Sequence, residues 1–214
     1  MDTEQEELEA LQKWWNENGK AIIVGLVIGL GGVFGWTTWQ SRVEATAERV
    51  SVVYQSMIDM AAADDHLEAM LRVEQIITDH PDSEYAALAA LVGAKSALAA
   101  DRGEDAKRLL EWVITNGAQE EVRDVARVRS AKLLLDEGNQ DAGLSMLAKV
   151  NTAAFAPAVE ELRGDFFVAG GENDAAAKAY RAALESESMT SGMRARVAMK
   201  HDDLGEKEEL GQSR

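Results

Sequence analysis

The sequence predicts an all-α protein in which a single N-terminal transmembrane helix precedes a row of short helices arranged in repeated pairs. Three observations support this prediction. Residues 21–39 carry no charge, although 28% of the 214 residues are charged. The remainder of the chain places apolar residues at helical spacing and lacks the alternating pattern typical of strands. A pair of one small and one large residue also recurs at a nearly constant interval, as in repeat proteins.

The first element is the uncharged segment 21–39, with the sequence AIIVGLVIGLGGVFGWTTW. As a helix it would extend about 28 Å, close to the roughly 30 Å thickness of the hydrocarbon core of a bilayer. Trp14 and Trp15 precede the segment, and Trp36 and Trp39 lie at its end, as expected of aromatic side chains at the two membrane interfaces. We therefore predict a transmembrane helix over residues 21–39.

A cleaved signal peptide is the alternative interpretation, because residues 45–47, Ala-Thr-Ala, offer a small-x-small cleavage pattern. Two features favour a retained anchor. The apolar run is longer than the roughly 7–15 residues of a signal sequence, and the preceding residues 1–20 are acidic rather than basic.

Charges beside the anchor give little guidance on its orientation. Lys13 and Lys20 precede it and Arg42 and Arg49 follow it, so the basic residues are equal in number on the two sides. Lys20 adjoins the apolar segment directly. This position favours a short cytoplasmic head at residues 1–20 and a translocated C-terminal domain.

Glycines give the predicted anchor one smooth face. Gly25, Gly29 and Gly32 fall within about 60° of one another around a helix, and Trp36 lies on the same face. Such a face allows a second membrane helix to approach closely, so these four residues are candidates for membrane-helix docking. The alternative is that glycine is simply more frequent in membrane helices than in soluble ones.

Residues 40–204 are predicted to form one helical domain, and the charged residues 205–214 a flexible tail. No glycine occurs between residues 36 and 92, so the first helix is expected to continue from the anchor to about residue 62. Eight shorter helices are expected to follow, near residues 66–79, 83–101, 104–116, 119–137, 140–150, 156–169, 173–187 and 189–203.

Internal repetition is the strongest signal in this domain. An alanine early in the second helix of each pair is followed four residues later by a larger apolar residue. The pairs are Ala69 with Val73, Ala106 with Leu110, Ala142 with Met146, and Ala176 with Tyr180, and their alanines lie 37, 36 and 34 residues apart. This pattern is typical of tetratricopeptide repeats, whose unit of about 34 residues carries A-x3-F in its second helix. A bundle of alanine-rich helices is the alternative.

Glycines also mark the expected turns inside the last three pairs, and a small residue lies seven positions before each. The glycines are Gly103, Gly138 and Gly171, and the small residues are Ser96, Ala131 and Gly164. Small residues at these positions are expected to let the paired helices approach closely.

Composition excludes several functions. Residues 40–214 carry a net charge of −12, which argues against nucleic acid or anionic lipid as a partner, because both need a cationic surface. The chain has no cysteine, so it has neither disulfides nor thiolate metal sites. Its three histidines fit no metal-binding spacing, and no nucleophile or phosphate-loop motif is present. We expect no enzymatic activity, no cofactor and no metal.

Two arginines are candidates for a protein-binding groove. Arg123 and Arg127 lie one turn apart on the first helix of a repeat, a helix of the kind that lines the concave face of a solenoid. There they could hold an acidic segment or a peptide carboxylate. The alternative is a solvated helix face on which the neighbouring Glu120, Glu121 and Asp124 balance their charge.

The chain resembles a known family at three places. The sequence 18–20, Asn-Gly-Lys, leads into a glycine-rich anchor that ends in Gly35, Trp36 and Trp39, and 162–164, Leu-Arg-Gly, lies in the alanine-anchored repeats. These features are similar to the YfgM family, the ancillary subunits of the SecYEG translocon with a tetratricopeptide-like periplasmic domain. The resemblance implies a single-pass protein of the bacterial inner membrane with a cytoplasmic N-terminus and a periplasmic domain. The partners it implies are the SecYEG translocon and the periplasmic chaperone PpiD.

Together these observations predict a non-enzymatic, membrane-anchored accessory subunit of the translocon. It would bind partner proteins and assist the periplasmic folding of secreted polypeptides. The alternative is a structural scaffold or adaptor for an envelope membrane-protein complex that binds no client chains.

Overall fold

The structure is a computed structural model that describes residues 2–212, apart from the side chains of residues 2–12, 21, 22, 24, 39, 41–45 and 205–212. It consists of two compact units, Met1–Arg49 and Val50–Arg214. The side chain of Trp39, predicted to lie at a membrane interface, is outside the described residues.

The N-terminal unit is formed by helix α1, which spans Asp2–Ala62 and so contains every residue of the predicted first helix. Within the part of the chain that the structure describes, its segment Lys13–Thr38 is the one helix long and apolar enough to cross a membrane. The large apolar side chains of this segment that the structure describes are exposed, including Ile28 at 69% and Phe34 at 75%. A continuous apolar surface of this kind suits a hydrocarbon environment.

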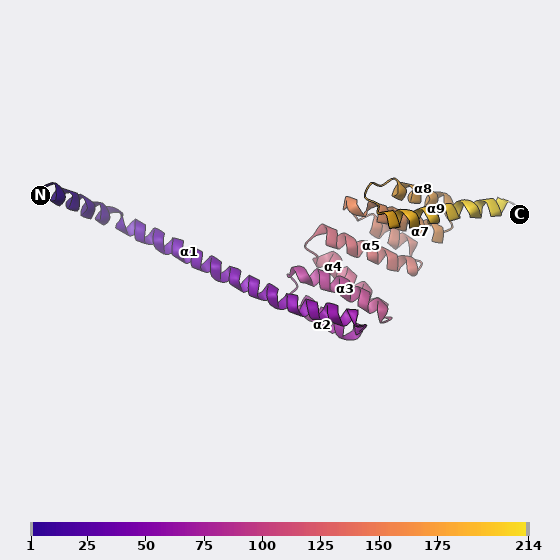
Figure 1. The fold of residues 1–214 in the computed structure, drawn as a ribbon, viewed down its shortest axis with the longest axis horizontal. Coiled ribbons are helices and arrows are strands. Elements are labelled where there is room, and N and C mark those ends of the chain that lie inside the picture. The colour runs from indigo at the N-terminus through magenta and orange to yellow at the C-terminus, as the bar shows by residue number, and fades with distance from the viewer. Residues whose placement is uncertain (1, 213–214) are drawn as a thin grey trace. The chain divides into compact units, whose positions relative to one another are not determined.

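The C-terminal unit contains the end of α1 and a series of shorter helices that follow one another in chain order (Figure 1). They are α2 (His66–Asp79), α3 (Glu84–Ala99), α4 (Gly103–Asn116), α5 (Glu120–Asp136), α6 (Gln140–Leu147), the 3-10 helix η1 (Ala153–Phe155), α7 (Ala156–Ala169), α8 (Asn173–Leu184) and α9 (Ser191–Gln212). The predicted all-α class is confirmed. The last helix continues to Gln212 rather than ending near residue 203, and its added residues are rich in the good helix formers Glu, Lys and Leu. The predicted flexibility of residues 205–214 stays a prediction.

Local chemistry sets where several of these helices begin. Ser83 precedes α3 and its hydroxyl accepts a hydrogen bond from the Tyr85 amide at 3.3 Å. Asn139 precedes α6 and accepts from the Ala142 amide at 3.4 Å. Pro157 lies in the first turn of α7, where its missing N–H leaves no hydrogen bond unmade.

The turns inside the four helix pairs share one backbone geometry. Each contains a single residue with positive φ, namely Asp64, Asp101, Gly138 and Gly171, with values between 56° and 76°. The amide after each of these residues donates to the carbonyl five residues earlier. These bonds join Asp65 to Met60 (3.0 Å), Arg102 to Ala97 (2.8 Å), Asn139 to Leu134 (2.8 Å) and Glu172 to Phe167 (2.8 Å). The four turns are therefore equivalent positions of one repeat, 37, 37 and 33 residues apart.

The predicted role of Gly103 as a turn residue was wrong. Gly138 and Gly171 occupy the left-handed position as expected, but Gly103 is the first residue of α4. Asp101 takes the left-handed conformation in that turn instead. Its short polar side chain makes aspartate one of the few residues other than glycine that tolerate this conformation.

The repeat register also differs from the prediction in the third pair. Each equivalent turn residue is followed five positions later by a buried small residue: Ala69, Ala106, Gly143 and Ala176. In the third pair this residue is Gly143, and its larger partner is Leu147 at 1% exposure. The predicted Ala142 and Met146 lie one position away and are only partly buried.

Small residues allow close helix packing, as predicted. Ser96 and Ala131 are 2% and 0% exposed. A Cβ atom added at Gly164 would lie 2.3 Å from Cε1 of Tyr180, and one added at Gly143 would lie 1.9 Å from Cζ of Phe166. Both aromatic rings therefore occupy the space that a side chain at these glycines would need.

We expect the substitution Gly143→Ala to destabilise the repeats by about 1–3 kcal/mol, because Phe166 is buried and its ring must move to admit a methyl group. This corresponds to a loss of about 2–4 °C in melting temperature per kcal/mol. Thermal unfolding of the full-length protein in detergent, followed by circular dichroism, measures the change. Gly192→Ala is the matched control, because a Cβ there meets nothing within 4 Å. Equal melting temperatures for the two variants would contradict the assigned packing.

Candidate functional site

The predicted docking face lies on α1 in the N-terminal unit. A Cβ added at Gly25, Gly29 or Gly32 would meet nothing within 4 Å, so the surface over these glycines is open. Trp36, on the same face, is 62% exposed. An open strip of backbone beside a large aromatic ring has the shape that a second membrane helix can pack against. Docking of a partner helix at this face stays a prediction.

The end of the apolar segment satisfies its own polar groups. The hydroxyls of Thr37 and Thr38 both donate to the carbonyl of Phe34, at 3.1 and 2.8 Å. Hydroxyls bonded to their own helix cost little in an apolar medium, where no water is present to bond them. These two threonines are therefore compatible with burial in a membrane.

The predicted arginine patch is built into the fold of the C-terminal unit. Asp124 on α5 is fully buried, and its Oδ2 accepts from the Thr152 amide (2.8 Å), the Thr152 hydroxyl (2.7 Å) and the Asn151 amide (3.1 Å). Nη1 of Arg127 donates to Oδ1 of Asp124 at 2.5 Å. The cluster attaches the chain between α6 and α7 to α5.

Arg123 is used in a similar way. Its Nη1 donates to the carbonyls of Gly117 (2.5 Å) and Ala118 (3.3 Å), at the end of α4, and its Nε donates to Glu120 at 3.2 Å. Glu120 also pairs with Arg127, whose side chain is only 14% exposed. Both guanidinium groups thus hold neighbouring segments of the domain together. Their binding of a partner's carboxylate stays a prediction.

The bonds around Asp124 affect its ionisation. Burial by itself raises the pKa of a carboxyl group, but hydrogen bonds from Thr152, Arg127 and Asn151 outweigh it. They hold the pKa of Asp124 below its ordinary value of 3.8. The carboxylate is therefore charged at neutral pH although it is buried.

A second cluster attaches the last helix. Glu161 on α7 accepts from Nε and Nη2 of Arg196, both at 2.7 Å, and from Nζ of Lys200 at 2.9 Å. Asp165 accepts from Lys200 and from the hydroxyl of Tyr180, the latter at 2.7 Å. Burial raises the pKa of Glu161, but the hydrogen bonds and charges of Arg196 and Lys200 lower it by a larger amount. The pKa of Glu161 therefore lies below its ordinary value. This cluster fixes α9 on α7 and α8.

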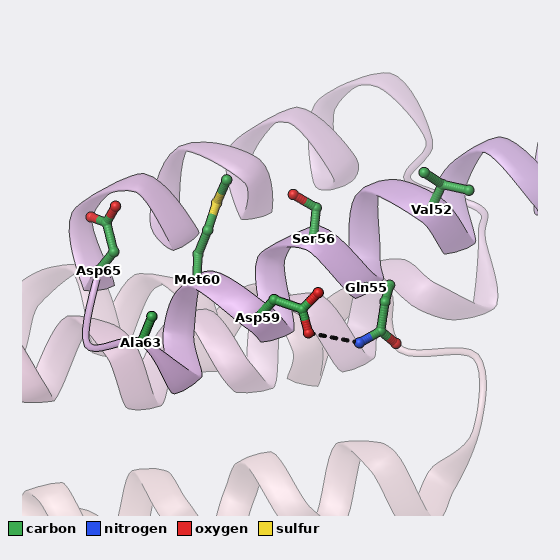
Figure 2. Close-up of a pocket in the computed structure, with 7 residues that line it drawn as sticks. All are labelled: Val52, Gln55, Ser56, Asp59, Met60, Ala63 and Asp65. Carbon is green, nitrogen blue, oxygen red and sulfur yellow. Dashed lines mark hydrogen bonds between the residues drawn. The ribbon is translucent and has the colours of Figure 1, made fainter.

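One surface was not singled out by sequence reasoning. A groove of about 560 Å³ lies on the end of α1 and the turn into α2 (Figure 2). Its lining residues are Val52, Gln55, Ser56, Asp59, Met60, Ala63 and Asp65. The side-chain amide of Gln55 donates to Asp59 at 2.9 Å. The sequence signal that could have revealed this surface is a pair of leucines, Leu67 and Leu71, at positions that are polar or charged in the other repeats.

Among the residues described, no group of three or more His, Cys, Asp or Glu side chains is placed to hold a metal ion. The most buried carboxylates, Asp124 and Glu161, serve the two clusters described above. These features define a class of protein: a helical-repeat protein whose N-terminal helix is apolar and long enough to cross a membrane.

Comparison with known proteins agrees with this class. Residues 12–206 match the model of the tetratricopeptide repeat-like domain. Three similar proteins are each named ancillary SecYEG translocon subunit. The relative from Haemophilus influenzae is 29% identical over 92% of this chain and 96% of its own length. The relative from Aggregatibacter actinomycetemcomitans is 33% identical (86% and 89%), and that from Escherichia coli 26% identical (95% and 97%). No solved structure matches the chain significantly.

The chain therefore belongs to the tetratricopeptide repeat-like family and, within it, to the family of ancillary SecYEG translocon subunits. The predicted repeat class and the predicted family are confirmed.

The ionisation of Asp124 leads to a pH-dependent stability. Since its pKa is lower in the folded chain than in the unfolded one, its carboxylate stabilises the fold fully above about pH 5, and this stabilisation is lost as the pH falls below about 4. We expect Asp124→Asn to cost about 3 kcal/mol or more at pH 7, because Arg127 loses its buried partner, and to flatten the acid limb of the stability profile. Urea unfolding of the full-length protein in detergent from pH 7 to pH 3 measures both effects.

Glu121→Gln is the control, because Glu121 is exposed on the same helix. If Asp124→Asn were as stable as Glu121→Gln at pH 7, the assigned role of Asp124 would be wrong.

Proposed function

We propose that this protein is a non-enzymatic, membrane-anchored accessory subunit of the SecYEG translocon that assists the periplasmic folding of secreted chains. The observation that carries the proposal is that the relatives named as translocon subunits match nearly the whole chain, apolar helix and repeats together. A tetratricopeptide-like domain is a protein-binding scaffold in which helix pairs stack into an extended surface. The proposed work of the chain is therefore binding rather than chemistry.

The proposed topology places residues 1–20 in the cytoplasm, the apolar segment of α1 in the inner membrane, and the repeats in the periplasm. Lys20, which adjoins the apolar segment, supports this orientation through the preference of basic residues for the cytoplasmic side. The acidic repeats, with a net charge of −12 for residues 40–214, have little attraction to the anionic membrane surface.

Membrane anchoring would allow the repeats to bind translocating chains even when the affinity of each contact is low. A domain held at the membrane meets translocating chains at a high effective concentration, so contacts of low intrinsic affinity are sufficient. In this proposal the open glycine face of α1 docks on membrane partners, namely the translocon and a PpiD-like chaperone. The repeats then contact secreted polypeptides as they emerge.

The docking role of α1 predicts the effect of filling the glycine face. We expect Gly29→Leu to leave membrane insertion intact, since it raises apolarity, but to lower the recovery of SecYEG with the full-length protein at least several-fold. Gly31→Leu is the matched control, because it makes the same change about 160° away around the helix. Affinity purification from membranes, with quantitative blotting of the translocon, measures recovery. Equal recovery with the two variants would remove the docking face from the proposal.

Client binding separates the proposal from its alternative, a scaffold that organises an envelope complex without touching clients. We expect a photo-crosslinking residue in place of Leu88 or Leu98, both on α3 and 40% and 43% exposed, to capture secretory chains during their translocation. The crosslinks should disappear when translocation is blocked. Crosslinks to resident envelope proteins alone would favour the scaffold.

A further inference from the structure

The first helix pair has an outer face whose equivalent in the second pair is buried. In α3, Ala89 is fully buried, and Gly93 packs so closely on α2 that an added Cβ would lie 2.8 Å from a methyl group of Val73. The turn register places Val52 and Ser56 of α1 at the positions of Ala89 and Gly93, 37 residues earlier. Val52 is 65% exposed. On α3 this surface packs against the second helix of the preceding pair. The equivalent surface of α1 packs against no such helix within the described part of the C-terminal unit.

This uncovered surface forms the groove shown in Figure 2. Val52, Ser56 and Met60 project from one side of α1, and Asp65 lies across the turn at the start of α2. Met60 corresponds to Ala97 of α3, which is fully buried. The groove thus has the lining of an interface between repeats.

The second helix of the first pair continues the same surface. In α4, Arg108 forms an ion pair with Glu74 of the preceding second helix, so its position faces along the stack towards the previous repeat. The corresponding residue of α2 is Leu71, which is 63% exposed. Leu67, one turn earlier, is 57% exposed and corresponds to Glu104.

Apolar residues at these two positions occur in the first pair alone among the four. The equivalent residues are Glu104 and Arg108 in α4, Asp141 and Ser145 in α6, and Asp174 and Lys178 in α8. A terminal repeat normally needs a polar outer face to remain soluble. The apolar residues Val52, Met60, Leu67 and Leu71, together with Ser56, form what we call the end surface.

Charge on the rim of the end surface indicates the chemistry of its partner. Asp59 and Asp65 line the groove and are exposed, and the side chain of Asp64 beside them is 93% exposed. The side-chain amide of Gln55, which bonds Asp59, is neutral and leaves its charge uncompensated. A second copy of this chain would bring the same carboxylates into opposition, whereas lysine or arginine would complement them.

We propose that the end surface binds one amphipathic helix of another protein, with an apolar face flanked by Lys or Arg. The helix takes the place that the second helix of a preceding repeat would occupy. This inference deepens the proposed function and rests on it for the expectation that the chain acts through protein partners.

The first test uses the full-length protein in native membranes with p-benzoylphenylalanine in place of Val52 as the probe. We expect light to crosslink this position to a single helical segment of another protein, identified by mass spectrometry of the crosslinked peptide. That segment should carry apolar residues at i, i+3, i+4 and i+7, bordered by Lys or Arg. The same probe at Met199, 60% exposed on α9, should not capture that segment.

The second test gives the first repeat the charges of the second. The double variant Leu67→Glu, Leu71→Arg should reduce the Val52 crosslink at least tenfold and leave the helical content unchanged, because both side chains are exposed. Met199→Glu, an equally exposed control, should have no effect. Asp59→Lys should weaken the crosslink, and replacing the facing Lys or Arg of the captured segment by Glu should restore it.

The opposite outcomes would overturn the inference. They are a crosslink to a second copy of this chain, to its own residues 1–49 or to lipid, the absence of any crosslink, and a crosslink that the double variant leaves unchanged. Failure here is distinguishable from failure of the proposed function. The effect of Gly29→Leu on SecYEG recovery and the capture of secretory chains at Leu88 or Leu98 do not depend on the end surface.

Discussion

The geometry of one turn governs the C-terminal unit. A residue with positive φ ends the first helix of each pair and lets the next amide bond back to a carbonyl five residues earlier. This fixes where the second helix starts, and with it which residue, five positions on, is buried in the helix packing. In the third pair this residue is Gly143, where an added Cβ would lie 1.9 Å from the ring of Phe166 on α7, the first helix of the next pair. Ala69, Ala106 and Ala176 are the equivalent residues of the other pairs, and the large side chains that pack around these four positions form the core.

Charged groups in this acidic chain are used to join segments. Asp124 holds the chain between α6 and α7, and Glu161 holds α9. Each buried carboxylate is matched by arginine and by further donors, so the cost of removing its charge from water is offset by several hydrogen bonds. The two clusters therefore stabilise the irregular segment around η1 and the attachment of the terminal helix.

The fold class, the helix pairs and the apolar anchor could be predicted because each depends on periodicity along the chain. The errors arose where two neighbouring residues fitted the same pattern. Ala142 and Gly143 both satisfied a small residue followed by a larger one, and only the turn geometry selects Gly143. Arg123 and Arg127 were visible as a charged pair, but their partners at Gly117 and Asp124 depend on how distant segments meet. The end surface was not predicted because single exposed leucines are common on protein surfaces. Leu67 and Leu71 indicate an uncovered apolar surface only after the turn register aligns them with Glu104 and Arg108.

The two ends of the repeat array differ in kind. At one end, α9 covers the last pair with Val197 and Leu204 and is locked there through Arg196 and Lys200. At the other end, no helix among the described residues of the C-terminal unit covers the first pair in this way. If both ends of the array had uncovered apolar surfaces, the last repeat of one copy could pack on the first repeat of another. Such heterologous contacts can continue into a filament. Because α9 covers one end of the array, copies that associated through the other end could not add further copies. This prevents polymerisation of a protein held at high density in a membrane.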